Sequence, residues 1–256
     1  MNRAALARSH LSLRVIPPRA GCDYFSTPQN YDALLCDIQR LRGNRYVADG
    51  AIPAAALDAQ GRHVTAEDEH SYHLAVWNGV VQGCLRIQLH PQAERHFTEF
   101  RVYDLIRRMP PEMAQKYHAG LEEFMCYGES RNYQITETGG WAVAEKFQFN
   151  AASLALPLAR WSFSRILPRQ ISIAAATERN GSAEMLKRIG GWRLKLNGEE
   201  LPPFYDPGYK CQMELLCFDS DILNPKFEPA VRDLQTLLEE QCVSLPGKPC
   251  HETICG

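Results

Sequence analysis

The chain has 256 residues, 45% of them hydrophobic, and a formal net charge of −2 at pH 7. This length is sufficient to bury a hydrophobic core, and the balanced charge gives no indication of nucleic-acid binding. The nine cysteines are scattered without the spacing of a zinc site. We therefore expect no metal, and reduced thiols in a cytoplasmic protein. No apolar stretch has the length of a transmembrane helix or of a signal peptide.

The first part of the chain is predicted to form a strand and then a helix. Residues 11–16 alternate apolar and polar side chains and end at two prolines, which is typical of a strand. Residues 31–41 carry apolar side chains at helical spacing, and the helix is expected to continue to Tyr46. The stretch 47–69 is rich in Ala, Gly and Asp and is expected to be a loop.

A β-hairpin is predicted next. Its strands are residues 72–77 and 80–89, and the Asn-Gly pair between them is the strongest short-range hairpin signal. Residues 97–109 and 111–126 are expected to be helical, with two prolines at their junction. They would form an insertion that covers one end of a sheet.

The chain is expected to be organised around residues 135–153, which begin as a strand and end as a helix start with Asn150 as N-cap. Gly139 and Gly140 weaken the strand, and such a pair marks a bulge or the close approach of a ligand or another backbone. The following helix N-terminus offers N–H groups and a positive dipole end to a phosphate. The alternative is a buried strand with a structural glycine pair.

The remaining chain alternates strands and helices, which predicts a mixed α/β sheet in one domain. The last stretch of the sheet, 212–218, is expected near the sheet edge. The predicted elements are a helix to about 166, a strand at 170–177, a helix at 181–189, strands at 192–196 and 212–218, and a helix at 227–241. The expected organisation is a single domain 1–256 with a core at about 11–220, a C-terminal helix at about 227–241 and a cysteine-containing tail, 242–256.

One motif resembles the end of the GNAT acyltransferase fold, which has the order Asn, two residues, Ala, two residues, Leu, and later Gly-aromatic. The matching residues are Asn180, Ala183, Leu186, Gly191 and Trp192. Lys187 stands where many members of this fold have a tyrosine that protonates the departing thiolate, so the resemblance does not assign that role.

A second comparison with this fold concerns the loop that grips the pyrophosphate of acetyl-CoA, Gln/Arg-x-x-Gly-x-Gly/Ala. Residues 148–153 read QFNAAS and lack both glycines, and side chains there hinder close backbone approach. This departure resembles the acyl-homoserine lactone synthases and the long-chain N-acyl amino acid synthases. The resemblance implies a donor bound to acyl carrier protein, whose phosphopantetheine has no adenosine diphosphate to grip.

Three further motifs agree with this subset. Arg42 and Tyr46 match a pattern in which an arginine is followed, after three residues, by an aromatic residue. Residues 83–87 resemble a strand with the pattern Gly-x-x-Arg-Leu. Residues 137–143 resemble Glu-x-Ser-Arg-Phe-x-Val, with Gly140 in place of the arginine of the lactone synthases. That replacement disfavours the lactone synthase substrate.

The Gly-Gly-Trp version of that motif and the entry to the hairpin at 68–74 look more like the N-acyl amino acid synthases. The resemblance covers about residues 31–220, and it predicts a single-domain GNAT-like sheet with a splayed central strand and a helical insertion.

Aminolysis of a thioester needs a neutral amine, a stabilised oxyanion and a stabilised thiolate. Glu137 is the candidate base, and its alternative role is an ion pair with Arg42 or Arg86. Backbone N–H groups of the central strand, of the start of the next helix and of Asn180, just before the helix at 181–189, are expected to serve the oxyanion and the pantetheine. They belong to Trp141, Ala142, Val143, Asn150, Ala151, Ala152, Ser153 and Asn180.

The acceptor and the acyl chain are expected to meet Arg42, Tyr46, Asp68, Arg86 and Trp141. Either arginine can bind a carboxylate bidentately or pair internally with Asp68 or Glu137. The two aromatic residues line an acyl tunnel or pack in the core. Cys84, Cys126 and His73 are expected in the core rather than in a nucleophilic or metal site. An acidic carrier protein would meet four basic residues, or these form a solvated face: Lys146, Arg160, Arg165 and Arg169.

These expectations predict an N-acyltransferase that moves a fatty acyl group from an acyl carrier protein thioester to the α-amine of an amino acid. The alternatives are an acyl-homoserine lactone synthase, an acyl-CoA-dependent GNAT N-acyltransferase, and a non-catalytic lipid-binding module. The donor is an acyl-phosphopantetheine or acyl-CoA substrate, with no permanently bound cofactor. The expected partners are acyl carrier protein and an amino acid, without nucleic acid, and with transient membrane contact through the lipid product.

Overall fold

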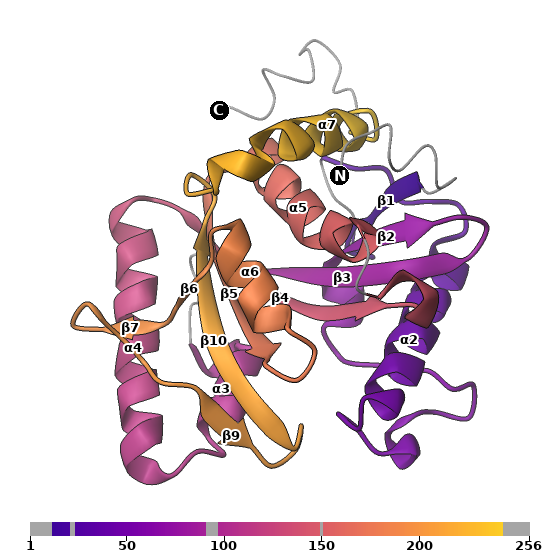
Figure 1. The fold of residues 1–256 in the computed structure, drawn as a ribbon. Helices are drawn as coiled ribbons and strands as arrows, with labels where there is room; N and C mark the ends of the chain where they lie inside the picture. The colour runs from indigo at the N-terminus through magenta and orange to yellow at the C-terminus, as the bar shows by residue number, and fades with distance from the viewer. Residues whose placement is uncertain (1–11, 21–23, 91–96, 149–150, 243–256) are drawn as a thin grey trace. The chain divides into compact units, whose positions relative to one another are not determined.

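The computed structural model describes residues 12–20, 24–90, 97–148 and 151–242. The chain forms two compact units, each assembled from separate stretches of sequence (Figure 1). Unit 1 consists of residues 1–88, 140–168 and 225–256, and unit 2 consists of residues 89–139 and 169–224. The expected organisation as a single domain stays a prediction.

Unit 1 contains a sheet in which β1 (Ser12–Ile16), β2 (Tyr72–Trp77) and β3 (Val81–His90) are antiparallel neighbours. The predicted hairpin is confirmed, and Gly79 at its turn has a φ of +91°, which glycine adopts without steric cost. The last residues of β4 (Gln134–Val143) lie next to β3, where the Ala144 N–H donates to the Gln82 carbonyl at 2.8 Å.

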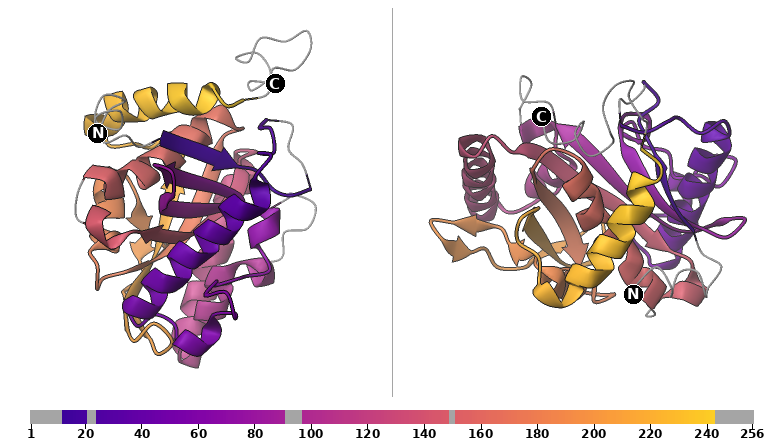
Figure 2. Two further views of the ribbon diagram at one scale, coloured as in Figure 1. Left: turned by 90° about the vertical axis from the view of Figure 1, so that its right-hand side faces the viewer. Right: turned by 90° about the horizontal axis from the view of Figure 1, so that it is seen from above.

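Helices cover both faces of this sheet. The residues of α2 (Tyr31–Ala48) share a core cluster with β1, β2 and β3, whereas α5 (Ala151–Ile166) contacts β2. Figures 1 and 2 show α7 (Glu228–Glu239) beside α5. Because β2 is covered twice, its side chains are buried on both faces.

The helix α2 continues two residues into the predicted loop 47–69, and the rest of that stretch is irregular except for two single turns of 3₁₀ helix. The described residues of unit 1 contain these 3₁₀ turns: η1 (Ala54–Ala56), η2 (Asp68–His70), η5 (Glu145–Phe147) and η6 (Pro225–Phe227).

Unit 2 contains the first residues of β4 in parallel pairing with β5 (Gln170–Thr177). The strand β10 (Cys211–Asp219) is antiparallel to β5 and pairs on its other side with β6 (Trp192–Arg193) and β9 (Phe204–Asp206). The prediction of β10 near the sheet edge is confirmed, because among the described strands only β6 and β9 lie beyond it, and both are too short to show a sequence pattern.

The single strand expected at 192–196 is corrected. The chain changes partner after β6, and β7 (Lys195–Leu196) pairs with β8 (Glu199–Glu200) in a separate two-stranded sheet. The turn at Asn197-Gly198 has positive φ at both residues, which suits a tight hairpin.

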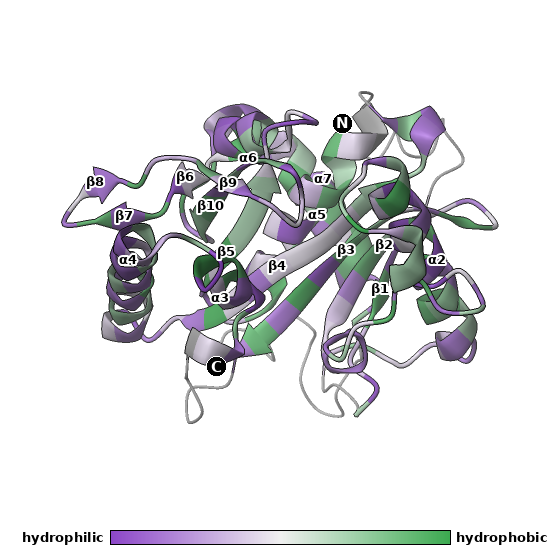
Figure 3. Cartoon of the chain, turned by 90° about the horizontal axis from the view of Figure 1, so that it is seen from below, coloured by the Kyte–Doolittle hydropathy of each residue, from purple (hydrophilic) through white to green (hydrophobic). Residues whose placement is uncertain are grey.

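The helices of unit 2 are η4 (Phe97–Glu99), α3 (Arg101–Ile106), α4 (Pro111–Ser130) and α6 (Ser182–Ile189). Both helices of the expected insertion are present, with a proline in the first turn of α4. Figure 3 shows hydrophilic and hydrophobic residues on α4, whose buried side joins the core formed with β4, β5 and β10. Cys126 lies on the exposed side of α4, which corrects its expected core position.

The architecture is the predicted mixed α/β class. Within the described ranges, no helix combines the length and the apolar composition needed to cross a membrane.

Candidate functional site

The regular geometry of β4 changes at its glycine pair. Residues Gln134–Thr138 pair in parallel with β5, and the register ends at Thr138 opposite Ala174, although β5 continues to Thr177. Two residues after Thr138, Gly140 has a φ of +62°. The backbone conformation there is one that side chains other than glycine rarely adopt.

Glu137 lies in unit 2, where its side chain is buried and holds the start of α3. Its Oε2 accepts the Arg101 N–H at 2.8 Å, and its Oε1 accepts the Val102 N–H at 2.7 Å. These N–H groups belong to the first turn of a helix and have no partner within the helix. Glu137 therefore has a structural role that the sequence did not indicate. A carboxylate has about four acceptor positions, so its role as a base stays a prediction.

His90 is an ionisable neighbour of Glu137 within unit 2. Its Nε2 lies 3.8 Å from Glu137 Oε2, and its ring stacks on Phe100 with centroids 3.8 Å apart and planes 15° apart. Sequence reasoning missed this residue as a partner of Glu137, because the two positions are far apart in the chain. No cluster of three potential metal ligands occurs among the described residues.

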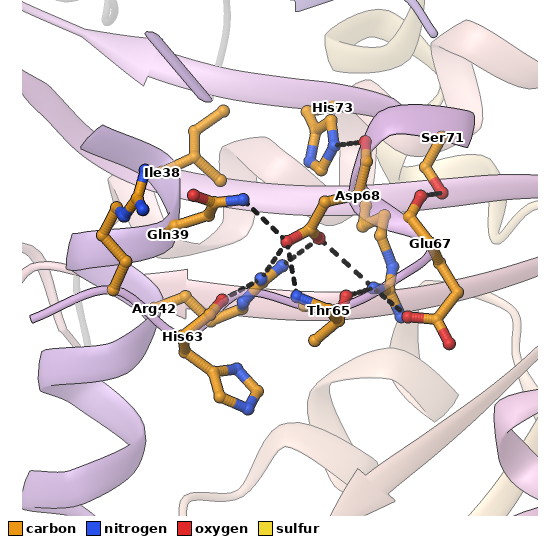
Figure 4. A network of polar contacts seen from close by, with 12 residues as sticks. Ile38, Gln39, Arg42, His63, Thr65, Glu67, Asp68, Ser71 and His73 are labelled. Atoms are coloured by element: carbon orange, nitrogen blue, oxygen red, sulfur yellow. Dashed lines mark hydrogen bonds and ion pairs between the residues drawn. The ribbon is translucent and has the colours of Figure 1, made fainter. Parts of the chain in front are cut away.

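Unit 1 contains a buried ion pair between Arg42 and Asp68 (Figure 4). Arg42 Nη1 donates to Asp68 Oδ1 at 2.8 Å and Nη2 donates to Oδ2 at 2.6 Å, while Nη2 also donates to the His63 carbonyl. Asp68 Oδ2 further accepts the Gln39 amide and the Thr65 N–H. Of the two roles expected for Arg42, the structure contains the internal pair with Asp68.

Arg86 joins the same network in a different way. Its Nη1 donates to Thr65 Oγ1 at 2.6 Å, to Glu67 Oε2 at 3.3 Å and to Asp68 Oδ1 at 3.4 Å. The fork formed by Nε and Nη2 takes no part in these three contacts. A guanidinium carries five N–H donors, so the carboxylate-binding role predicted for Arg86 is compatible with its internal pair.

The charges of this network are set by burial and by pairing. Burial alone would raise the pKa of Asp68, but the hydrogen bonds and charge of Arg42 outweigh it and hold that pKa well below its usual range. Burial lowers the pKa of His73 to about 4, so its ring, which contacts the Asp68 carbonyl at 2.8 Å, is neutral at pH 7. Burial raises the pKa of Cys84 to about 12, which makes it an unreactive core thiol as predicted.

Gly140 packs against the two arginines of this network. A Cβ at this position would lie 3.2 Å from Arg86 Cβ and 3.4 Å from Arg42 Nη1. Any side chain would therefore be strained at its positive φ and would also press on the network. The absence of a side chain at Gly140 thus allows Arg42 and Arg86 to pack closely against β4.

The other residues predicted to contact the pantetheine and the acyl chain differ in burial and in the elements that carry them. Tyr46 packs at the edge of the core cluster of α2, and its ring centroid lies 5.7 Å from that of His63. Trp141 is half-buried, and among the described residues its Nε1 has no hydrogen-bond partner. Their acyl-tunnel role stays a prediction. Of the others, Ala142 is buried, Val143 is half-buried, Ala151 and Ala152 begin α5, Ser153 is buried, Asn180 is exposed in a turn, and Asn150 lies outside the described residues.

Lys187 is held by an acidic residue that sequence reasoning missed. Its Nζ donates to Glu214 Oε1 at 3.0 Å, and Arg193 Nε donates to Glu214 Oε2 at 2.8 Å. Glu184 also lies 3.4 Å from Lys187 Nζ. The lysine that stands at the position of the GNAT tyrosine therefore belongs to an ion-pair network around a buried glutamate.

The expected carrier-protein docking set needs a correction. Arg160 is buried, and burial lowers its pKa to about 9, so it cannot meet the acidic surface of a partner. Arg165 forms a bidentate pair with Glu228. Arg169 and Lys146 are exposed, with Asp221 at 3.7 Å from the Arg169 Nε. They are the basic residues of the set that remain accessible.

Comparison with solved structures identifies the fold. The acyl-homoserine lactone synthase LasI aligns with 92% of this chain and 98% of its own, with a TM-score of 0.51 and 16% identity. The CoA-dependent acyl-homoserine lactone synthase BjaI, solved with SAM and isopentyl-CoA, aligns with 90% of this chain and 88% of its own, with a TM-score of 0.53 and 15% identity.

A protein of the yellow fever mosquito assigned as arylalkylamine N-acetyltransferase 7 aligns with 82% of this chain and 88% of its own, with a TM-score of 0.50 and 11% identity. No protein-family model matches the sequence, and a sequence search of curated proteins finds no match. At these identities the likeness establishes the fold, which is the GNAT-like fold that the sequence motifs predicted.

Proposed function

We propose that this chain is an N-acyltransferase that moves a fatty acyl group from an acyl carrier protein thioester to the α-amine of an amino acid. The observation that carries the proposal is the change in β4, where parallel pairing ends at Thr138 and Gly140 adopts positive φ. In a sheet, such a change leaves backbone N–H and C=O groups for an extended ligand. A pantetheine arm is an extended chain of amides that can use them.

The fold supports an acyl-transferring enzyme, because the solved structures that share it include lactone synthases and an arylalkylamine N-acetyltransferase. The absence of glycine from Gln148–Ser153 supports a donor with a single phosphodiester, since a pyrophosphate needs closer backbone approach. A CoA thioester is the second candidate donor, and the likeness to the CoA-dependent BjaI favours it.

The donor is tested by comparing a long-chain acyl carrier protein with the matching acyl-CoA, at low and at raised ionic strength, with release of free thiol as the readout. We expect a higher kcat/KM with the carrier protein. The advantage should shrink with salt, because contacts between charged surfaces are screened.

The charge reversals Lys146→Glu and Arg169→Glu should reduce the rate with the carrier protein more than the rate with acyl-CoA, and Arg160→Gln should show no such selective effect. Equal or better use of acyl-CoA at low salt would assign the CoA donor. Failure to release thiol from either donor with any amine would indicate a binding module.

The acceptor is tested through Arg86. If its Nε and Nη2 fork binds the acceptor carboxylate, Arg86→Lys should raise the KM for the amino acid about tenfold, because lysine lacks the fork. The KM for the decarboxylated amine should not change. Arg40→Lys, at a surface pair with Asp37 on α2, is the matched control. Equal use of an amino acid and its decarboxylated amine by the unmodified protein would contradict a carboxylate site.

A further inference from the structure

The acceptor amine must lose a proton before it attacks a thioester, and unit 2 holds a second group placed to receive that proton. We propose that His90 is the proton acceptor behind Glu137, so that Glu137 takes the proton of the acceptor ammonium and passes it to His90 Nε2. This inference rests on the proposed function, because it concerns the acceptor of that reaction. His90 acts through Glu137 and is thus a positioning residue.

The imidazole packs against Phe100 and lies close to Glu137. Its ring stacks on Phe100, and its backbone carbonyl accepts the Gln134 amide at 2.6 Å. The side chain is 4% exposed, and Nε2 has no hydrogen-bond partner within the described ranges. A buried ring nitrogen left without a partner is costly, and Glu137 Oε2 lies 3.8 Å from it. Hydrogen bonds of catalytic groups are often long without substrate and shorten when it binds.

The hydrogen bonds of Glu137 explain why the proton moves on. Oε2, the oxygen that faces His90, also accepts the Arg101 N–H at 2.8 Å. A proton on that oxygen weakens the bond to a helix N–H, whose loss is expensive. In the imidazole tautomer that carries its proton on Nδ1, Nε2 has a lone pair that can take the proton, and the carboxylate beside it stabilises the imidazolium that forms.

The transfer balances in atoms and charge. An N–H bond of the ammonium breaks and leaves its electron pair on nitrogen, an O–H bond forms at Oε2, and this bond breaks as Nε2–H forms. Ammonium, carboxylate and imidazole become amine, carboxylate and imidazolium. After attack and cleavage of the C–S bond, the thiolate takes the second proton of the amine, and the imidazolium returns its proton to solvent.

Few other charges surround this pair. Of the described residues on the elements packed around His90, the charged ones besides Glu137 are Glu99 on η4, and Arg101 and Asp104 on α3. Arg101 is exposed, Asp104 is half-buried, and their side chains lie 3.5 Å from each other, so solvent and pairing screen them. Glu137 is the buried charge among them.

The experiment measures thiol release against pH for the full-length protein, with His90→Gln and with His90→Phe, which keeps the stack on Phe100. We expect both variants to lower kcat at least tenfold, to leave the KM for the donor unchanged, and to lose the low-pH limb of the wild-type profile. His118→Gln, in a surface pair with Glu122 on α4, should behave as wild type. A residue that only packs would change thermal stability and leave the shape of the profile unchanged.

A His90→Phe variant with the wild-type profile and a kcat within about threefold of wild type would overturn the proposal while leaving the acyltransferase function intact. A wild-type protein that releases no thiol overturns the proposed function, and this inference with it. If both variants unfold, an NMR measurement on the wild-type protein still tests the proton role of His90. Its His90 ring NMR signals should change over the pH range in which activity appears, and signals that stay constant there would contradict the proton role.

Discussion

Replacing Asp68 by alanine is expected to lower the free energy of unfolding by about 3–5 kcal/mol, because it leaves the Arg42 guanidinium buried without its carboxylate. Arg42 is 2% exposed and donates two hydrogen bonds to Asp68. The change also removes the acceptor of the Gln39 amide and the Thr65 N–H. Chemical denaturation followed by circular dichroism measures this loss.

The matched control is Asp37→Ala, which removes a carboxylate from an exposed pair with Arg40 on the same helix, α2. Its expected effect is about 0–1 kcal/mol. If the two variants lose similar stability, the buried network stabilises the fold no more than a surface ion pair does.

The pH dependence of the same measurement separates charge from packing. The folded-state pKa of Asp68 is depressed, so its stabilisation is fully present above the unfolded value of about 3.9 and is lost as pH falls below it. The difference between wild type and Asp68→Ala should therefore shrink in acid. His73 has a pKa of about 4 in the folded state and of about 6.5 in the unfolded state. Between these two pH values only the unfolded state binds the His73 proton, so the free energy of unfolding of both proteins falls as the pH is lowered from about 6.5 to 4.

Replacing Glu137 by glutamine is expected to lower turnover by roughly 10²-fold or more, because the base is removed while the shape of the side chain is kept. The structure adds a second effect. The amide oxygen can accept one N–H of α3, but the NH₂ group then faces the other, at a cost of about 1–3 kcal/mol in unfolding free energy. Thiol release and thermal unfolding measure the two effects separately.

Glu145→Gln is the matched control, since Glu145 is exposed in η5 shortly after β4; both measurements should stay at wild-type values. A folded Glu137→Gln variant with wild-type turnover would remove Glu137 from the mechanism. A variant that unfolds in the assay would leave Glu137 with its structural role at the start of α3.

Elements whose signal is local could be predicted from the sequence. The hairpin of β2 and β3 follows from alternation and an Asn-Gly turn, and α2 follows from helical spacing. The glycine pair of β4 marked the point where strand geometry changes, because glycine is the residue that adopts positive φ without steric cost. The ordered motifs ending in Gly191-Trp192 predicted the fold.

The sequence could not assign partners to charged side chains. It left Arg42 open between a substrate carboxylate and Asp68, and it placed Arg160 on a docking face although that residue is buried. It identified neither Glu214 as the partner of Lys187 nor the short strands that cover β10. Glu137 and the α3 backbone that it binds are separated by 35 and 36 positions. Periodicity records which face of an element is buried, whereas the partner of a buried charge depends on which distant segments pack together, so only the tertiary structure decides it.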